Sequence, residues 1–154
     1  MAVKTRKHVT VTLKDATGTP ITKVLGPTPG DFQIQGLQEN NTEGLPIYSR
    51  GSFLELVEGD DVQIQGSITV YHDGNLTGTS VADAMLKAGN FASGVTKDPG
   101  GVVWTLDTVV EVTRGADTDT FTLSNCRFQF DYNEDKEGNK LPIKFTCYGG
   151  CALT

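Results

Sequence analysis

The sequence predicts a mainly-β protein, a β-sandwich or partly closed barrel of about seven to eight antiparallel strands with one short flanking α-helix at about residues 80–89. Two observations predict this class. Apolar and polar residues alternate in several segments, as in strands with one buried face, and turn signals rich in glycine and proline separate these segments. The length of 154 residues fits a single domain, 1–154, with an N-terminal arm at residues 1–7 and a long loop at residues 38–52.

Three strands are predicted before the long loop. Residues 6–14 alternate valine and leucine with threonine, and residues 21–25 form a short second strand after a Gly-Thr-Pro turn. The third strand, residues 31–37, follows a Pro-Thr-Pro-Gly breaker and places Phe32 and Ile34 on one side, opposite its two glutamines. These strands are expected to present one apolar face to a core.

The middle of the chain contains the predicted loop and the clearest strand. In residues 38–52 the alternation gives way to polar residues, two glycines and a proline, and residues 53–57 form a short strand or the return of the loop. Loops of this length are uncommon in compact domains and often have a function. Residues 61–72 alternate cleanly, and the residues expected to point inward are Val62, Ile64, Ile68 and Val70.

One helix is predicted between the two halves of the chain. Ser80 followed by Asp83 is an N-capping pattern, and Gly89 is a natural residue to end the helix. The apolar residues at helical spacing are Val81, Ala84, Met85 and Ala88. A short helix with one apolar stripe is expected to pack over an end or a face of the sheet.

The C-terminal half predicts three further strands and a bulge. Residues 102–113 form a strand whose apolar face is Val102, Trp104, Leu106, Val110 and Val112. The next strand changes phase, because its apolar residues are odd-numbered up to Leu123 and even-numbered from Cys126. A side chain changes faces only where an extra residue is inserted, so a β-bulge is predicted near Ser124 and Asn125. A charged hairpin tip at residues 133–139 leads into the last strand.

No catalytic, cofactor-binding or metal-ligating residue is predicted. The two histidines have no predictable partner for acid–base or nucleophilic chemistry. The spacing of Cys147 and Cys151, with no histidine nearby, is not that of a zinc site. The run that starts at Asp131 begins like a calcium loop but has Lys136 where that loop needs glycine. The protein is therefore predicted not to be an enzyme.

Cysteine usage and charge exclude further classes. Three cysteines are an odd number, and no signal peptide precedes them, so free, buried or half-buried thiols are expected. The net charge of −6 argues against a nucleic-acid-binding protein. No segment is apolar for long enough to span a bilayer, so no membrane anchor is expected.

The central block of the chain resembles the tail tube proteins of tailed bacteriophages. The residues that carry the resemblance are Gly30–Leu37 (GDFQIQGL), Tyr48–Phe53 (YSRGSF), Leu56–Asp61 (LVEGDD) and the turn His72-Asp73-Gly74. A short helix after this hairpin and a C-terminal pair of strands also fit the layout of the family. The resemblance covers most of residues 6–150.

The resemblance implies a structural virion protein that polymerises. Its copies would form hexameric rings that stack into a hollow tail tube, through which phage DNA passes into the host. The protein would lie in the tail of the virion after assembly in the host cytoplasm. Its partners would be itself and other tail proteins, namely the tape measure, the terminator and, where a tail has one, the sheath. Tubes of secretion systems have a related architecture.

Two groups of residues are candidates for contacts in such a tube. Residues 31–36 and 61–66 have similar sequences, each presenting two glutamines, and acidic residues follow the predicted loop. The candidates for the wall of the lumen are Gln33, Gln35, Gln63, Gln65, Glu55, Glu58, Asp60 and Asp61. The candidates for contacts between subunits are Asn40, Asn41, Glu43, Leu45, Ile47 and Arg50.

Other readings of the same features remain open. The acidic clusters also suit solvated loops that keep the protein soluble. A monomeric β-sandwich module that binds carbohydrate would share the fold, but such modules present exposed aromatic residues, and Trp104 is expected in the core. A tail terminator or completion protein and a subunit of a secretion tube are also compatible with the sequence.

Overall fold

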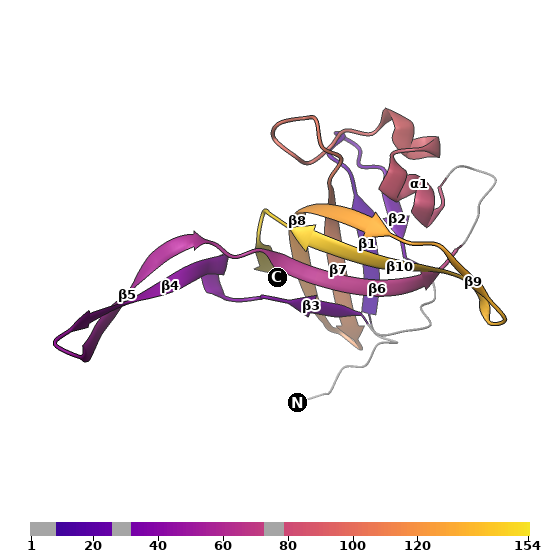
Figure 1. Cartoon of the computed structure of the whole chain (residues 1–154). Helices are drawn as coiled ribbons and strands as arrows, with labels where there is room; N and C mark the ends of the chain where they lie inside the picture. The colour runs from indigo at the N-terminus through magenta and orange to yellow at the C-terminus, as the bar shows by residue number, and fades with distance from the viewer. Residues whose placement is uncertain (1–8, 26–31, 73–78) are drawn as a thin grey trace.

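The protein is mainly β, as predicted, with a large antiparallel sheet and one short helix (Figure 1). The computed structural model describes residues 9–25, 32–72 and 79–154. In these residues one sheet has nine strands, in the order β2-β1-β7-β8-β10-β6-β3, with β11 on β8 and β9 on β10. The sheet is not closed into a barrel, since β2 and β3 end it without pairing with each other. The predicted N-terminal arm, residues 1–7, lies outside the described residues.

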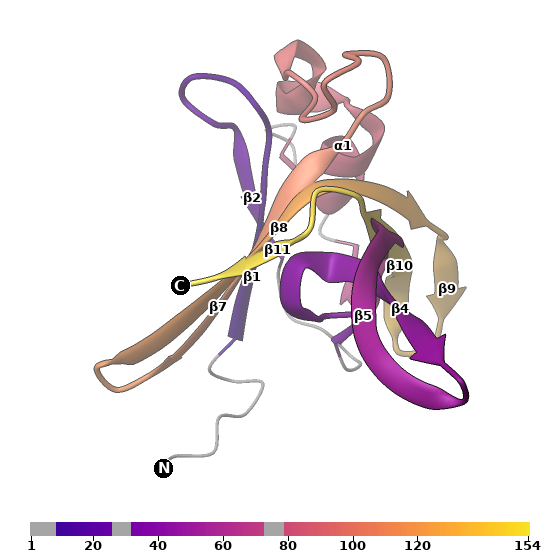
Figure 2. The same cartoon turned by 90° about the vertical axis from the view of Figure 1, so that its left-hand side faces the viewer.

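The strands form two layers that share one long strand (Figure 2). The first layer contains β1 (Val9–Lys14), β2 (Thr22–Val24) and β7 (Leu106–Arg114). The second contains β3 (Gln33–Gln35), β6 (Ile64–Tyr71), β9 (Asn133–Asp135) and β10 (Gly138–Cys147). The shared strand is β8 (Asp117–Phe130), on whose first half β11 (Cys151–Leu153) also pairs. The remaining elements are η2 (Glu39–Asn41), β4 (Thr42–Ser49), β5 (Ser52–Asp61), α1 (Val81–Leu86) and η3 (Gly89–Ser93).

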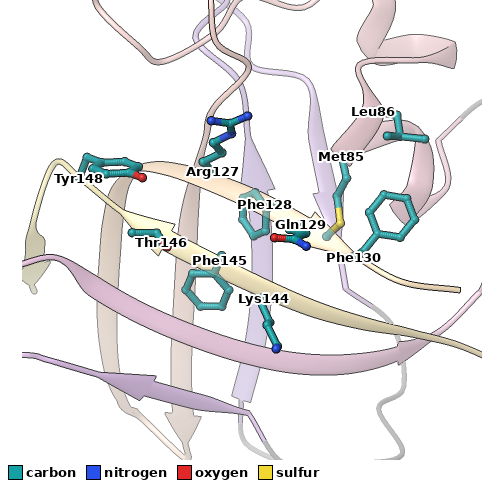
Figure 3. A pocket seen from close by; sticks show the side chains of 10 residues that line it. All are labelled: Met85, Leu86, Arg127, Phe128, Gln129, Phe130, Lys144, Phe145, Thr146 and Tyr148. Atoms are coloured by element: carbon teal, nitrogen blue, oxygen red, sulfur yellow. The ribbon is translucent and has the colours of Figure 1, made fainter.

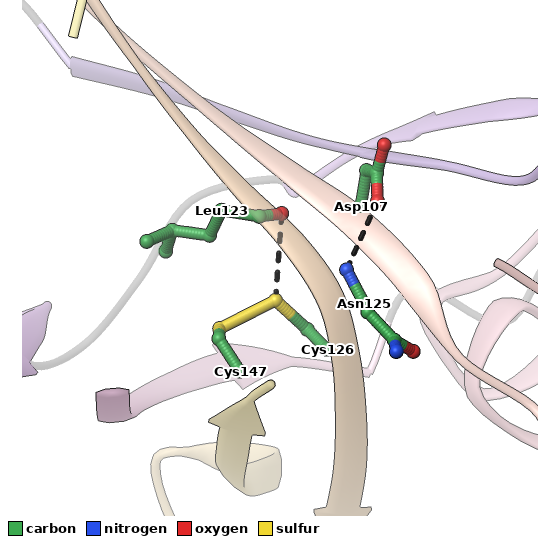
Figure 4. Close-up of a disulfide and its surroundings, with 5 residues drawn as sticks. All are labelled: Asp107, Leu123, Asn125, Cys126 and Cys147. Carbon is green, nitrogen blue, oxygen red and sulfur yellow. Dashed lines mark hydrogen bonds between the residues drawn. A yellow bond between two sulfur atoms is a disulfide. The ribbon is translucent and has the colours of Figure 1, made fainter. Parts of the chain in front are cut away.

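The predicted β-bulge bends β8 from one layer into the other. Leu106 and Thr108 of β7 pair with Cys126 and Leu123, so β8 has one residue more than β7 between these pairs. Asn125 takes up the extra length with a left-handed φ of 57°, and its N–H donates to Oδ1 of Asp107 at 3.1 Å (Figure 4). Before the bulge β8 pairs with β7, and after it β8 pairs with β10.

The core lies between the two layers and under α1. Leu13 and Leu106 from the first layer pack in one cluster with Leu141 and Ile143 from the second, and each is fully buried. Burial of one such side chain contributes about 1.5–3 kcal/mol. Three of the four residues predicted to point inward at residues 61–72, namely Ile64, Ile68 and Val70, are buried, because alternation along β6 sends every second residue inward. Val62 precedes β6 and is only half-buried.

The helix begins as predicted and ends earlier. Ser80 and Asp83 form a capping box, in which each side chain accepts from the backbone N–H of the other residue. The helix ends at Leu86 rather than near Gly89, because Lys87 takes the left-handed conformation with φ 53°. The N–H of Ala88 then donates to the carbonyl of Asp83 at 2.9 Å, which closes the last turn. Val81, Ala84 and Met85 are buried.

The strand predicted at residues 102–113 starts later. Val102 was expected to face the core but is 89% exposed. It lies in a turn that is closed by Thr105, whose N–H donates to Oγ1 of Thr96 at 2.9 Å, and β7 begins only at Leu106. Trp104 is half-buried against the core, and its Nε1 donates to the carbonyl of Ala84 at 2.8 Å. It therefore ties this turn to α1.

Two of the three cysteines are paired, so the expectation of free thiols is wrong for them. Cys126 on β8 and Cys147 on β10 lie directly opposite each other, with their Cα atoms 4.1 Å apart, and form a disulfide (Figure 4). The register of two neighbouring strands brings them together. Cys151 is free and half-buried, and burial raises the pKa of its thiol.

Candidate assembly surface

The segment predicted as a long loop is one strand of a β-hairpin. β4 and β5 pair with each other as a separate two-stranded sheet, which projects away from the body of the molecule (Figure 1). Arg50 and Gly51 turn the chain with φ values of 50° and 81°, both in the left-handed region typical of a type I′ hairpin turn. The loop prediction failed because Gly44 and Pro46 are residues typical of loops and because two register shifts interrupt the alternation.

Both faces of this hairpin carry exposed apolar side chains. The register pairs Leu45 with Val57, Pro46 with Leu56, and Tyr48 with Phe53. One face, called here the Leu45 face, therefore consists of Leu45, Ile47, Glu55 and Val57. The other, called the Leu56 face, consists of Gly44, Pro46, Tyr48, Phe53, Leu56 and Glu58. The exposed fraction is 47% for Leu45 and 62% for Leu56, so neither face is covered in the single chain.

The hairpin is also acidic. Residues 42–61 contain five acidic residues against one arginine at the tip. Four of the acids were candidates for the wall of a lumen, and the structure places Glu55, Glu58, Asp60 and Asp61 on exposed positions of β5, outside the sheet that holds Gln33, Gln35 and Gln65. The acidic and the glutamine candidates are thus two separate sites.

Asn41 fixes the base of the hairpin to the body. Its φ is 52°, its carbonyl accepts from the N–H of Val62 at 2.7 Å, and its Nδ2 donates to the carbonyl of Val62. Gln38 adds a bond from Nε2 to the carbonyl of Thr42 at 2.6 Å. Asn41 is buried, and its Oδ1 has no protein partner within the described part of the chain. Asn41 was predicted at a contact between subunits; in the single chain it holds the base of the hairpin through its bonds to Val62.

The other residues predicted to make contacts between subunits lie along the hairpin or at its base. Asn40 lies in η2 at its base, Glu43 is the second residue of β4, and Arg50 lies at its tip. Leu45 and Ile47 share one face. The sequence analysis did not include the apolar residues of β5, namely Phe53, Leu54, Leu56 and Val57, among the candidates for contacts. A run of apolar residues flanked by acidic ones was nevertheless a signal of an exposed strand.

A second surface is the polar face of the layer β3-β6-β10-β8. The strand register aligns two rows of side chains across four strands on the face away from the core. One row is Gln33, Ser67, Lys144 and Gln129, and the other is Gln35, Gln65, Thr146 and Arg127. Figure 3 shows the part of this face on β8 and β10. Three of the four predicted glutamines therefore lie together, whereas Gln63 is exposed just before β6 begins.

The layer β3-β6-β10-β8, called here the polar layer, has β3 at one side and β8 at the other, and each of these two strands has an unpaired edge in the described residues. In the described residues β3 pairs only with β6, and residues 127–130 of β8 pair only with β10. All neighbouring strands in this layer are antiparallel, so β3 and β8 run in opposite directions. Edge strands with free N–H and C=O groups are able to pair with another chain.

Among the described residues one carboxylate is fully buried, that of Asp15, and it has a structural role. Asp15 accepts from the N–H of Ile21 at 2.8 Å, of Val95 at 3.1 Å and of Thr17 at 3.3 Å, and from the hydroxyl of Thr17 at 2.8 Å. Burial would raise the pKa of Asp15, but these hydrogen bonds favour the carboxylate, and the pKa is lowered overall. These bonds hold the turn after β1 together and join it to the backbone of Val95.

Comparison with known proteins assigns neither a family nor a function to this chain. No protein-family model, no curated protein and no solved structure matches the chain. Among the residues that the structure describes, no group of three histidine, cysteine, aspartate or glutamate side chains is arranged to hold a metal ion. Within the same residues no helix has the length and hydrophobicity needed to cross a bilayer.

Proposed function

We propose that this chain is a structural protein that assembles with copies of itself into stacked rings, and that the resulting hollow tube is the tail tube of a tailed bacteriophage. The observation that carries the proposal is the β4–β5 hairpin, whose two apolar faces are exposed in the single chain. Exposed apolar patches of this kind mark interaction sites or cause aggregation. Covering the exposed half of one leucine contributes about 1 kcal/mol, so burial of this hairpin strongly favours assembly.

The unpaired edges of the polar layer support a closed ring. β3 of one copy and residues 127–130 of β8 in the next copy run in opposite directions, so head-to-tail pairing would continue the antiparallel sheet. A repeated head-to-tail contact forms a ring when its rotation closes, which removes every free edge. The family resemblance implies hexameric rings, and a hexamer is one such closed ring.

In such a ring the polar face of the sheet would form the wall of the lumen. Gln33, Gln35 and Gln65 lie on this face with Ser67, and their neutral amides and hydroxyl give DNA no fixed charge to bind. Lys144 and Arg127 are the two charged residues in the same rows. The acidic residues of β5 belong to the hairpin and serve its contacts instead. In the virion tail, assembled in the host cytoplasm, the partners of the tube would be the tape measure, the terminator and, where present, the sheath.

The purified protein tests the proposal directly. Sedimentation velocity and negative-stain electron microscopy over a range of concentrations are expected to show rings and short tubes. The matched control replaces residues 43–60 with an Asn-Gly turn, since Thr42 and Asp61 are paired and a two-residue turn fits between them. This variant should remain a folded monomer. A wild-type protein that stays monomeric at high concentration would exclude self-assembly as its function.

A further inference from the structure

We propose that this chain binds a calcium ion at the base of the β4–β5 hairpin, beside Asn41 and Asp61. The ion would join the hairpin to the turn at Gly149 and Gly150, which connects β10 to β11. The inference goes beyond the proposed function, because it concerns the single chain and does not require self-assembly.

The first step is a hollow of about 260 Å³ between the base of the hairpin and this turn. A space of this size holds an ion together with several water molecules. The two glycines have no side chains, so the turn presents only backbone atoms to the hollow. The lining consists of Asn41, Asp61, Val62, Tyr148, Gly149 and Gly150.

The second step is the unsatisfied side-chain oxygen of Asn41. This residue is 8% exposed, and its Oδ1 has no hydrogen-bond partner in the described part of the chain. Its Nδ2 donates to the carbonyl of Val62, and turning the amide over would direct Oδ1 at that same carbonyl, so the orientation is fixed. A buried acceptor without a donor indicates a bound water molecule or ion.

A second hollow, of about 240 Å³, borders the same amide. It shares Asn41 and the two glycines with the first hollow, and its lining also includes Gln38 and Ser124. The Nε2 of Gln38 donates to the carbonyl of Thr42 at 2.6 Å, which leaves its Oε1 as a further neutral oxygen. The residues around Asn41 therefore offer amide, hydroxyl and backbone oxygens, which are ligands that Ca²⁺ accepts.

The third step is the charge, which favours a cation over water. Asp61 contributes a carboxylate to the first hollow, and no lysine or arginine lines either hollow. Glu43 and Asp60 add negative charge at the same end of the hairpin. Ca²⁺ takes about six to eight oxygen ligands in irregular arrangements, whereas Mg²⁺ needs a nearly regular octahedron. A single carboxylate in the lining makes the site weak, with a dissociation constant of about 0.1–1 mM.

Terbium luminescence locates the ion in the full chain, in dilute solution where sedimentation shows monomers. Tb³⁺ occupies calcium sites, and excitation of Tyr148 in the lining of the first hollow should be transferred to it. A saturable signal that Ca²⁺ displaces is expected. Tyr148→Leu should lose most of this signal but keep the stabilisation by Ca²⁺ in urea unfolding. The control is Tyr132→Leu, beside the other acidic segment, which should keep the signal; loss of the signal in this control instead would overturn the site.

Two substitutions that each remove one negative charge test the ligands. Asp61→Asn changes the lining, whereas Asp60→Asn makes the same change one residue away, outside the lining. Both residues are exposed, so both variants should fold as the wild type does. The dissociation constant for Ca²⁺, measured by competition with Tb³⁺, should rise at least about tenfold for Asp61→Asn. It should stay within about twofold of the wild type for Asp60→Asn.

Two results would overturn the site. Equal effects of the two substitutions would mean that the acidic hairpin attracts cations in general, without a defined place for one. A signal that does not saturate, or that Ca²⁺ does not displace, would mean that water alone satisfies Asn41. Neither result bears on self-assembly, which sedimentation and electron microscopy measure separately, so failure of the site and failure of the proposed function are distinguishable.

Discussion

The carboxylate of Asp15 allows a quantitative test of the fold around β1. Replacing Asp15 with alanine removes an acceptor from three backbone N–H groups, those of Thr17, Ile21 and Val95. Leaving a buried donor unsatisfied costs about 1–3 kcal/mol, and water can reach some of the vacated space. The free energy of unfolding is therefore expected to fall by about 3–5 kcal/mol. Asp15→Asn keeps the shape and one acceptor oxygen, and should lose less.

The same group gives a dependence on pH. The pKa of Asp15 is lower in the folded protein than its ordinary value, so the unfolded chain binds a proton at a higher pH than the folded chain does. The stability contributed by Asp15 is then complete above about pH 4 and is lost as the pH falls through the folded pKa. Asp15→Asn should remove this part of the acid sensitivity.

The assay is urea unfolding of the hairpin-truncated monomer, followed by the fluorescence of Trp104, between pH 3 and pH 7. The truncated protein is used because assembly would add stability that depends on concentration. A loss of less than about 1 kcal/mol for Asp15→Ala at pH 7 would refute the reasoning, because it would mean that the three N–H groups find other partners. An unchanged pH profile for Asp15→Asn would refute the titration argument.

Three further changes probe the body of the protein. Gly66→Ala would place a Cβ atom 2.2 Å from the ring of Phe145, so unfolding by urea should show a loss of about 1–3 kcal/mol. Ser80→Ala removes the cap of α1 and should cost about 1 kcal/mol in the same assay, with Ser80→Asp as the variant that retains a cap. Reduction of the Cys126–Cys147 disulfide, whose cysteines are 21 residues apart, should cost about 3 kcal/mol; an unchanged unfolding midpoint after verified reduction would contradict this.

The strands with one buried face could be predicted from the sequence because alternation along them follows directly from burial. The bulge was predictable for the same reason, since the change of phase between Leu123 and Cys126 requires an extra residue. The pairing of Cys126 with Cys147 also had a signal in the sequence, which the expectation of free thiols did not take into account. A two-residue turn at residues 136–137 sets the register of β8 and β10 and puts Cys126 opposite Cys147.

The hairpin and the buried carboxylate could not be predicted in the same way. Alternation reports burial against the chain's own core, and β4 and β5 have no such core to face. Their apolar residues therefore lie on both sides and mix with Gly44 and Pro46. Asp15 carries no signal because its partner Val95 is eighty positions away in the sequence, and only the fold brings that backbone close.

The acidic residues of the hairpin disfavour a contact between two hairpins. Two exposed hairpins could otherwise stack face to face, which is the common route from an unprotected strand to aggregates. Each hairpin carries five acidic residues against Arg50, so two hairpins in contact repel within the screening distance of about 8 Å at physiological salt. In the proposed assembly, charge would therefore disfavour a contact between two hairpins. A contact between the hairpin and a different surface of a neighbouring copy could repeat from copy to copy and close into a ring.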